Sequence, residues 1–202
     1  MVKKKKRRVV DQKKLEEKIL KVAIDIAKQG QGALFVIGKT SYSKLMRQKF
    51  KEFSVFSKGS EKLLKSLAVI DGAVIITKEG IVRDYGTMIK NTKAFPGYGT
   101  RHAAAVTASQ NGDTAIMCSE EEHKVKIFKN GKYVMQIDAL QKDVEKNVDK
   151  MTGILESVGA GFIGTIGAAT LAPAVGIALL PGVVIFGGSY YAIRFLLKKF
   201  IK

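Results

Sequence analysis

The chain of 202 residues carries 35 Lys and Arg against 18 Asp and Glu, a formal net charge of +17, and it contains a single cysteine, Cys118. One cysteine excludes a framework of disulfides within the chain and favours a reducing compartment. The positive charge attracts nucleotides, nucleic acid and acidic lipid head groups alike, so it does not choose among these partners.

A basic tail over residues 1–11 opens the chain. Six Lys and Arg follow one another over residues 3–8. Such a run is either a solvated, disordered tail or a surface that contacts lipid or nucleic acid. Charged residues interrupt the stretch that follows it, so no apolar run of a signal peptide is present and a cleaved secretory signal is not expected.

The residues after this tail predict a helix and then a buried strand. Apolar residues recur at spacings of three and four through residues 12–29, and Gly30 ends this helix. The apolar run over residues 33–37 predicts a strand buried on both faces. Two short helices are expected next, over residues 43–50 and 61–67.

A strand, a returning strand, a loop and a helix are predicted in the middle of the chain. Residues 69–76 are β-branched and apolar except at Asp71-Gly72, and they predict a strand that returns over residues 81–85. Glycines over residues 95–99 indicate a loop. The Ala-rich residues 101–110 then suit a helix.

The last part of this unit predicts further strands and a charged connecting helix over residues 139–151. Three strands are expected, over residues 114–118, 125–128 and 133–137. The last two flank Asn130-Gly131, a strong short-range signal for a hairpin. Helices and strands in this order predict an α/β domain over residues 12–150, with a mixed β-sheet and flanking helices.

The composition changes abruptly in the C-terminal unit, residues 151–202. No charged residue occurs over residues 157–193, and Gly and Ala dominate there. The stretch exceeds the roughly 20 residues that cross a bilayer once, and its small residues suit close packing of membrane helices. We therefore expect a transmembrane helical hairpin with its bend between Pro173 and Pro181. The alternative is a buried helical pair in a soluble oligomer.

Basic residues after this stretch predict its orientation. Arg194, Lys198, Lys199 and Lys202 follow it, and positive residues favour the cytoplasmic side. Both ends of the hairpin then face the cytoplasm. These patterns predict a protein of the cell membrane whose α/β domain faces the cytoplasm, with membrane lipids as partners and the basic tail adding attraction to anionic lipid.

An isolated carboxylate interrupts the apolar run at Asp71-Gly72-Ala73. Burying a lone carboxylate is costly unless it meets a partner or a metal ion. Gly72 has no side chain, so a ligand could approach the backbone there. The ordinary alternative is a turn that contains a capped Asp.

A Gly-rich loop runs into the predicted helix at Gly99-Thr100-Arg101-His102. The first N–H groups of a helix lack internal partners and attract phosphate. Thr100 adds a hydroxyl, and Arg101 can hold phosphate oxygens through two parallel hydrogen bonds. His102 is either a base, a metal ligand or a hydrogen-bonded structural residue. The pattern is not a P-loop, and an ordinary capped helix with a surface Arg and His is the alternative.

A third motif, Ser119-Glu120-Glu121-Glu122, follows a predicted strand. On a basic protein, this acidic run is either a solvated loop or a contact for a metal ion or nucleotide. In this order and approximate spacing, the three motifs resemble the diadenylate cyclase domain, whose paired motifs read Asp-Gly-Ala and Arg-His-Arg. The apolar run over 32–37 and the Lys129-Asn130-Gly131 hairpin are similar too, so the resemblance covers residues 12–150.

The resemblance implies that each subunit binds one ATP and that two subunits face each other as a homodimer. The 3′-hydroxyl of each ATP attacks the α-phosphate of the other, which yields cyclic di-AMP and two pyrophosphates. Asp71 is the implied ligand of a divalent ion, Mn²⁺ or Mg²⁺. Catalysis is implied for Asp71, Arg101 and His102. ATP contacts are implied for Gly72, Ala73, Met88, Gly99, Thr100, Arg101, Ser119 and Glu121.

One departure from the family pattern keeps another function open. Ala103 stands where the family has its second Arg. A nucleotide-binding sensor that does not turn ATP over is therefore the first alternative. A membrane-tethered protein that binds nucleic acid through its basic residues is the second. The second alternative does not account for Asp71-Gly72 or for the Gly-rich loop, so nucleic acid is not an expected partner.

Overall fold

The computed structural model describes residues 11–46, 49–93, 99–110, 112–159, 177–180 and 182–185. The basic tail before residue 11 and most of the predicted loop over 95–99 lie outside these residues. The helices are α1 (Gln12–Lys28), α2 (Ser60–Ala68), α3 (Thr100–Ser109), the 3₁₀ helix η1 (Val144–Asn147) and α4 (Val148–Gly159). The strands are β1 (Ala33–Ile37), β2 (Tyr42–Lys44), β3 (Phe53–Ser54), β4 (Ala73–Ile76), β5 (Ile81–Ile89), β6 (Thr114–Ser119), β7 (Lys124–Lys129), β8 (Lys132–Asp138), β9 (Ile177–Leu180) and β10 (Val183–Ile185).

The ten strands form one mixed sheet in the order β2-β5-β4-β1-β6-β7-β8-β10-β9, with β3 paired to β5. β1 and β4 are parallel, with Phe35 opposite Val74. The other pairs are antiparallel. The predicted mixed sheet with flanking helices is therefore confirmed.

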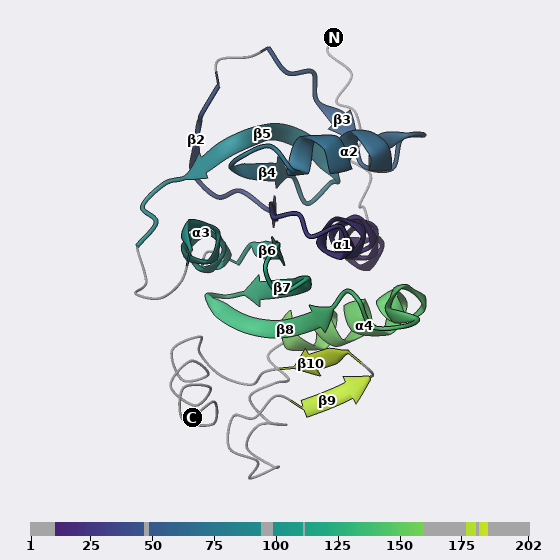
Figure 1. The fold of residues 1–202 in the computed structure, drawn as a ribbon. Helices are drawn as coiled ribbons and strands as arrows, with labels where there is room; N and C mark the ends of the chain where they lie inside the picture. The colour runs from purple at the N-terminus through teal and green to yellow at the C-terminus, as the bar shows by residue number, and fades with distance from the viewer. Residues whose placement is uncertain are drawn as a thin grey trace.

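Helices cover both faces of this sheet because the central strands are apolar on both faces. All five residues of β1 are buried. Phe35 faces the cluster formed with α1, α2 and α4, whereas Leu34 faces the cluster formed with α3. α1 and α3 accordingly lie on opposite sides of the sheet (Figure 1).

Most elements of the α/β domain lie where the sequence predicts them. α1, β1 and α3 differ from their predicted ranges by at most one residue at each end. The predicted hairpin joins β7 to β8, and Asn130 and Gly131 have φ of 52° and 69°. Two successive positive φ angles are the requirement of a tight hairpin turn, and Asn-Gly meets it.

Three local predictions are wrong. Tyr42–Lys44 is a strand rather than part of a helix over 43–50, because it pairs with the part of β5 that extends to Ile89. The strand predicted from residue 69 begins only at Ala73, since Gly72 has φ of 101° and is not extended. Asp143, with φ of 61°, interrupts the helix predicted over 139–151, so α4 begins at Val148.

The C-terminal unit differs most from the prediction. Residues 177–185, where we expected the bend and second arm of a helical hairpin, contain β9 and β10, which extend the sheet from β8. Among the described residues, no helix is both long and apolar enough to cross a membrane. The core also continues past the expected boundary at residue 150, because Met151, Leu155 and Val183 are fully buried in it. The remainder of the charge-free stretch, at 160–176 and 186–193, lies outside the described residues.

Candidate active site

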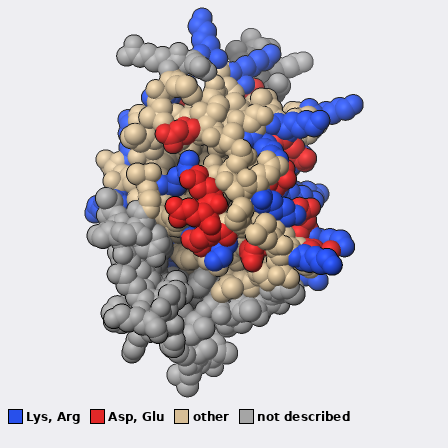
Figure 2. Space-filling view, in the orientation of Figure 1, with Lys and Arg blue, Asp and Glu red and all other residues tan. Residues whose placement is uncertain are grey.

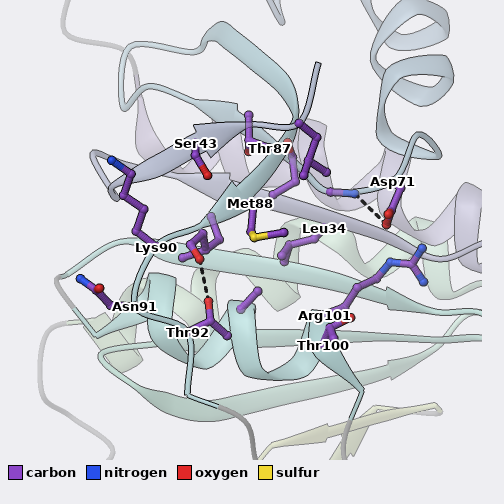
Figure 3. A pocket seen from close by; sticks show the side chains of 15 residues that line it. Leu34, Ser43, Asp71, Thr87, Met88, Lys90, Asn91, Thr92, Thr100 and Arg101 are labelled. Atoms are coloured by element: carbon purple, nitrogen blue, oxygen red, sulfur yellow. Dashed lines mark hydrogen bonds between the residues drawn. The ribbon is translucent and has the colours of Figure 1, made fainter. Parts of the chain in front are cut away.

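A cavity of about 630 Å³ opens where β2, the start of β4, the second half of β5 and the first turn of α3 meet. Its lining residues are Leu34, Ser43, Leu45, Asp71, Gly72, Ala73, Thr87, Met88, Ile89, Lys90, Asn91, Thr92, Thr100, Arg101 and Ala104. The cavity therefore joins the first two sequence motifs, which are far apart along the chain. Figure 3 shows Asp71 and Arg101 on the same side of it, with Lys90 and Asn91 at the opposite end.

Asp71 lies in the turn that connects α2 to β4, and it is exposed rather than buried. Its Oδ1 accepts a hydrogen bond of 3.0 Å from the backbone N–H of Gly72. A Cβ on Gly72 would lie 2.6 Å from the backbone nitrogen of Thr87. Glycine is therefore required here by its positive φ and by the close passage of β5. Gly72 also lines the cavity, where the sequence predicts that a ligand could approach the backbone.

The first turn of α3 brings a hydroxyl and a guanidinium to the cavity. Gly99 is the N-cap and supplies no side-chain hydrogen bond to the helix. Thr100 and Arg101 follow it and line the cavity. Arg101 Nη1 lies 3.3 Å from Glu120 Oε2, and both side chains are partly exposed. A helix N-terminus with Thr and Arg in its first turn is chemically suited to phosphate.

His102 is adjacent to Arg101 in the chain but does not line the cavity. Its ring packs edge-on against Phe128, with 6.4 Å between ring centroids. Its Nε2 lies 3.2 Å from Lys126 Nζ. Burial, and then the positive charge of Lys126, lower the pKa of His102 to about 4, against the weaker opposing effect of Glu122. The ring is therefore neutral at pH 7, and it contacts the core and Lys126 rather than the cavity.

The acidic run after β6 does not line the cavity either. Ser119 ends β6 and Glu121 is exposed. Glu122 pairs with Lys126 and Lys124. Burial favours the neutral form of Glu122, but hydrogen bonds from these two lysines outweigh it and lower the pKa of the carboxyl. The described residues contain no group of three or more His, Cys, Asp or Glu side chains that could hold a metal ion by itself.

Ala103, at the position that departs from the family motif, is 3% exposed and belongs to the apolar cluster under α3. It does not line the cavity.

Several cavity residues had no signal in the sequence. Ser43 and Leu45 come from the segment that was expected to be helical, and Thr87 comes from the part of β5 that was not predicted. Lys90 and Asn91 follow β5 and add a second positive charge opposite Arg101. The signal available in the sequence was Lys90, a cation directly after the nine residues that form β5. It could have indicated that this strand ends at a polar site.

Comparisons with known proteins agree with the motifs. The family model described as DAC, DisA bacterial checkpoint controller nucleotide-binding, matches residues 21–133. A protein of Methanocaldococcus jannaschii named diadenylate cyclase is 36% identical over 143 residues, which are 63% of this chain and 46% of that protein. A second diadenylate cyclase, from Haloferax volcanii, is 32% identical over 140 residues, or 59% of this chain and 51% of that protein. The chain thus spans about half the length of the curated relatives it matches.

Two solved structures are also similar to part of the chain. A double mutant of DacA from Staphylococcus aureus is 25% identical with a TM-score of 0.44, over 59% of this chain and 84% of that one. A hypothetical membrane spanning protein from Bacillus cereus is 22% identical with a TM-score of 0.42, over 57% of this chain and 59% of that one.

Proposed function

The chain belongs to the DAC family of DisA-type nucleotide-binding domains, whose model matches more than half of it, and on that premise we propose that it condenses two ATP molecules into cyclic di-AMP. One observation carries the proposal: Asp71, Thr100 and Arg101, which come from two separate motifs, line one cavity. The size of that cavity, about 630 Å³, suits one small ligand per chain.

The lining gives each part of ATP a matching surface. Leu34, Leu45 and Met88 offer apolar contact to the base, and Met88 is 57% exposed before any ligand covers it. Arg101 and Thr100, at the start of α3, hold the phosphates through hydrogen bonds directed from the helix terminus. Asp71 then lies nearest to the attacking hydroxyl.

A divalent ion, Mg²⁺ or Mn²⁺, fits this site only together with the nucleotide. Asp71 uses Oδ1 to accept the Gly72 N–H, and its carboxylate is exposed. Mg²⁺ is commonly held by one or two carboxylates together with substrate phosphates and water, so one Asp at the cavity is enough. Asp71 would hold the ion, which would neutralise phosphate charge.

Assembly follows from the stoichiometry of the product. One cavity binds one ATP, whereas cyclic di-AMP contains two AMP units. Two copies of the chain must therefore place their cavities face to face, so that each 3′-hydroxyl oxygen attacks the α-phosphorus of the opposite ATP. Two phosphodiester bonds form, while two hydroxyl O–H bonds and two bonds to the bridging oxygens of the β-phosphates break. Two pyrophosphates and two protons leave. This alignment of bound reactants is the main contribution of the dimer.

The direct test is incubation of the purified chain with ATP and Mg²⁺ or Mn²⁺, followed by identification of products by mass. The expected products are cyclic di-AMP and pyrophosphate. A chain that binds ATP and forms no cyclic dinucleotide with either ion would instead be a sensor. Ala103, at the position of the family's second Arg, is the feature that favours that alternative.

The absence of charge over residues 157–193 supports a second proposal, that the chain is held at the cell membrane with its cavity facing the cytoplasm. The lipid-contacting residues would be those of this stretch outside β9 and β10, together with the basic residues that follow it. Flotation of the full chain with vesicles that contain anionic lipid tests this. Co-migration with the vesicles is expected, and a chain that stays monodisperse in detergent-free buffer beside them would contradict it.

A further inference from the structure

Two adjacent residues at the start of α3 are each held from the turn between β6 and β7. Glu120 in this turn pairs with Arg101 at 3.3 Å. Glu122 in the same turn binds Lys126, whose Nζ lies 3.2 Å from His102 Nε2. In Figure 2, acidic side chains gather over β6 in the middle of the face shown. The acidic run thus bonds to the first turn of α3, directly and through Lys126.

The contact through Lys126 is fixed by burial. The Lys126 side chain is 7% exposed. A buried ammonium is costly without partners, and Glu122 and His102 supply them. The His102 ring is held on its other side by the edge-on contact with Phe128. The backbone of α3 at residue 102 is therefore anchored to β7, one residue after Arg101.

The contact between Glu120 and Arg101 depends on Gly32, which lies outside the three motifs. A Cβ on Gly32, just before β1, would lie 2.3 Å from Arg101 Nη1 and 2.8 Å from Glu120 Oε2. Gly32 has no positive φ, so alanine fits its backbone. The clash falls on the far ends of two flexible side chains. Alanine at this position would therefore move the guanidinium and leave the fold intact.

We propose that the β6–β7 turn holds the Arg101 side chain in position to bind the phosphates of the nucleotide, and we call this turn the clamp. Its positioning residues are Glu120, Glu122 and Lys126. Gly32 leaves the space that the Arg101–Glu120 pair occupies. The inference rests on the proposed function, in which Arg101 holds phosphate. An exposed ion pair such as Arg101–Glu120 contributes little to stability. Its effect is to restrict the Arg101 side chain before the nucleotide binds. Binding then loses less side-chain entropy, so the affinity for the nucleotide is higher.

The dissociation constant for ATP, measured by titration calorimetry on the full chain, tests the clamp. Gly32→Ala and Glu120→Ala should each raise it about tenfold with little change in melting temperature. Two matched controls should leave it unchanged. Glu145→Ala removes an ion pair of similar exposure, with Lys28 on α1. Gly153→Ala on α4 adds a Cβ with no atom of the described residues within 4 Å, apart from its own helix backbone.

A double-mutant cycle separates positioning from direct contact. If Glu120 acts through Arg101, Glu120→Ala should cause no further loss of affinity in a chain that already carries Arg101→Ala. Additive losses would mean that Glu120 contacts the nucleotide or its metal ion itself, and tighter binding by Glu120→Ala would mean that Glu120 competes with phosphate. Either result overturns the clamp.

Hydrogen exchange distinguishes failure of the clamp from failure of the proposed function. Backbone amides of residues 102–105 should exchange faster in Lys126→Met than in the parent and both controls, whether or not cyclic di-AMP is made. Lys126→Arg, which retains a cation for Glu122, should restore much of the protection. Unchanged exchange in Lys126→Met would overturn the proposal even in an active enzyme.

Discussion

At the scale of single residues, the proposed site contains a carboxylate that the fold leaves exposed, Asp71. Among the described residues that line the cavity, Asp71 is the only acid. Asp71→Asn keeps its size and removes its charge, so cyclic di-AMP synthesis should fall by at least about a hundredfold, the scale of one lost electrostatic group in catalysis. The measurement is the initial rate of product formation at saturating ATP.

A second Asp→Asn substitution serves as the control for that rate. Asp25 on α1 is exposed and pairs with Lys65 on α2, outside the cavity lining. Asp25→Asn should therefore cyclise ATP at the parental rate. Near-parental turnover by folded Asp71→Asn would show that Asp71 is not the catalytic carboxylate.

His102 makes a prediction about stability and pH. Its pKa is lowered from 6.5 to about 4 in the folded chain, mainly by burial. Between these two pH values the unfolded chain binds a proton that the folded chain does not, so the free energy of unfolding should decrease as pH falls through this window. At about 1.4 kcal/mol per pKa unit, the loss is at most about 3.5 kcal/mol.

Thermal or urea unfolding at pH 7, 6 and 5 measures this loss. His102→Gln keeps a polar group beside Lys126 but does not titrate. It should therefore lose less stability than the parent between pH 7 and 5. Equal losses in the two proteins would show that His102 is not the group responsible.

Some of the site residues predicted from the sequence line the cavity, and others do not. Asp71, Thr100, Arg101 and Met88 line the cavity. His102 follows Arg101, but successive helix residues point about 100° apart, so the fold carries its ring to Phe128 instead. Spacing along the chain gives the order of motifs, whereas the direction of each side chain depends on where α3 packs.

At the scale of elements, one buried ion pair joins α1 to β7. Lys129 Nζ lies 2.9 Å from Glu16 Oε1, and the two side chains are 11% and 1% exposed. Lys129 also donates to the Leu155 carbonyl oxygen of α4 at 3.2 Å. This pair therefore lies where a helix from each end of the domain meets the sheet.

Breaking the pair should destabilise the chain strongly. Lys129→Met leaves the Glu16 carboxylate buried without its cation, which typically costs about 3–5 kcal/mol in unfolding free energy. Lys28→Met, which removes the exposed pair with Glu145, should cost no more than about 1 kcal/mol. Denaturant titration measures both. If the two substitutions lowered the free energy of unfolding equally, burial of the ion pair would not determine the loss of stability.

Elements with a strong period or a specific turn were predictable, and those set by distant pairing were not. α1 has apolar residues on one face, and the Asn130-Gly131 turn needs two positive φ angles. β2 forms because it pairs with the edge of β5. β10 pairs with β8, which lies more than forty residues earlier in the chain. No local pattern encodes either pairing, since the partner strand supplies the hydrogen bonds.

At the scale of the whole molecule, the proposed reaction requires two chains. Specific activity should therefore rise with protein concentration while dimers are only partly formed. Addition of Asp71→Asn chains to a fixed amount of parent should lower activity per parent chain, because mixed dimers carry one defective cavity. Activity that stays proportional to parent chains, while labelled chains are shown to exchange, would exclude a shared reaction.

The measurement that tests the central claim most directly follows the origin of the two AMP units. The chain is incubated with a divalent ion and an equal mixture of ordinary ATP and ATP labelled with ¹³C in the adenosine, and the products are identified by mass. Condensation of two separately bound ATP molecules predicts light, mixed and heavy cyclic di-AMP, with the mixed form most abundant, and predicts that Asp71→Asn forms almost none of them. Formation of ADP or AMP alone, or no product from a chain that binds ATP, would contradict the assignment of this cavity as the site of cyclic di-AMP synthesis.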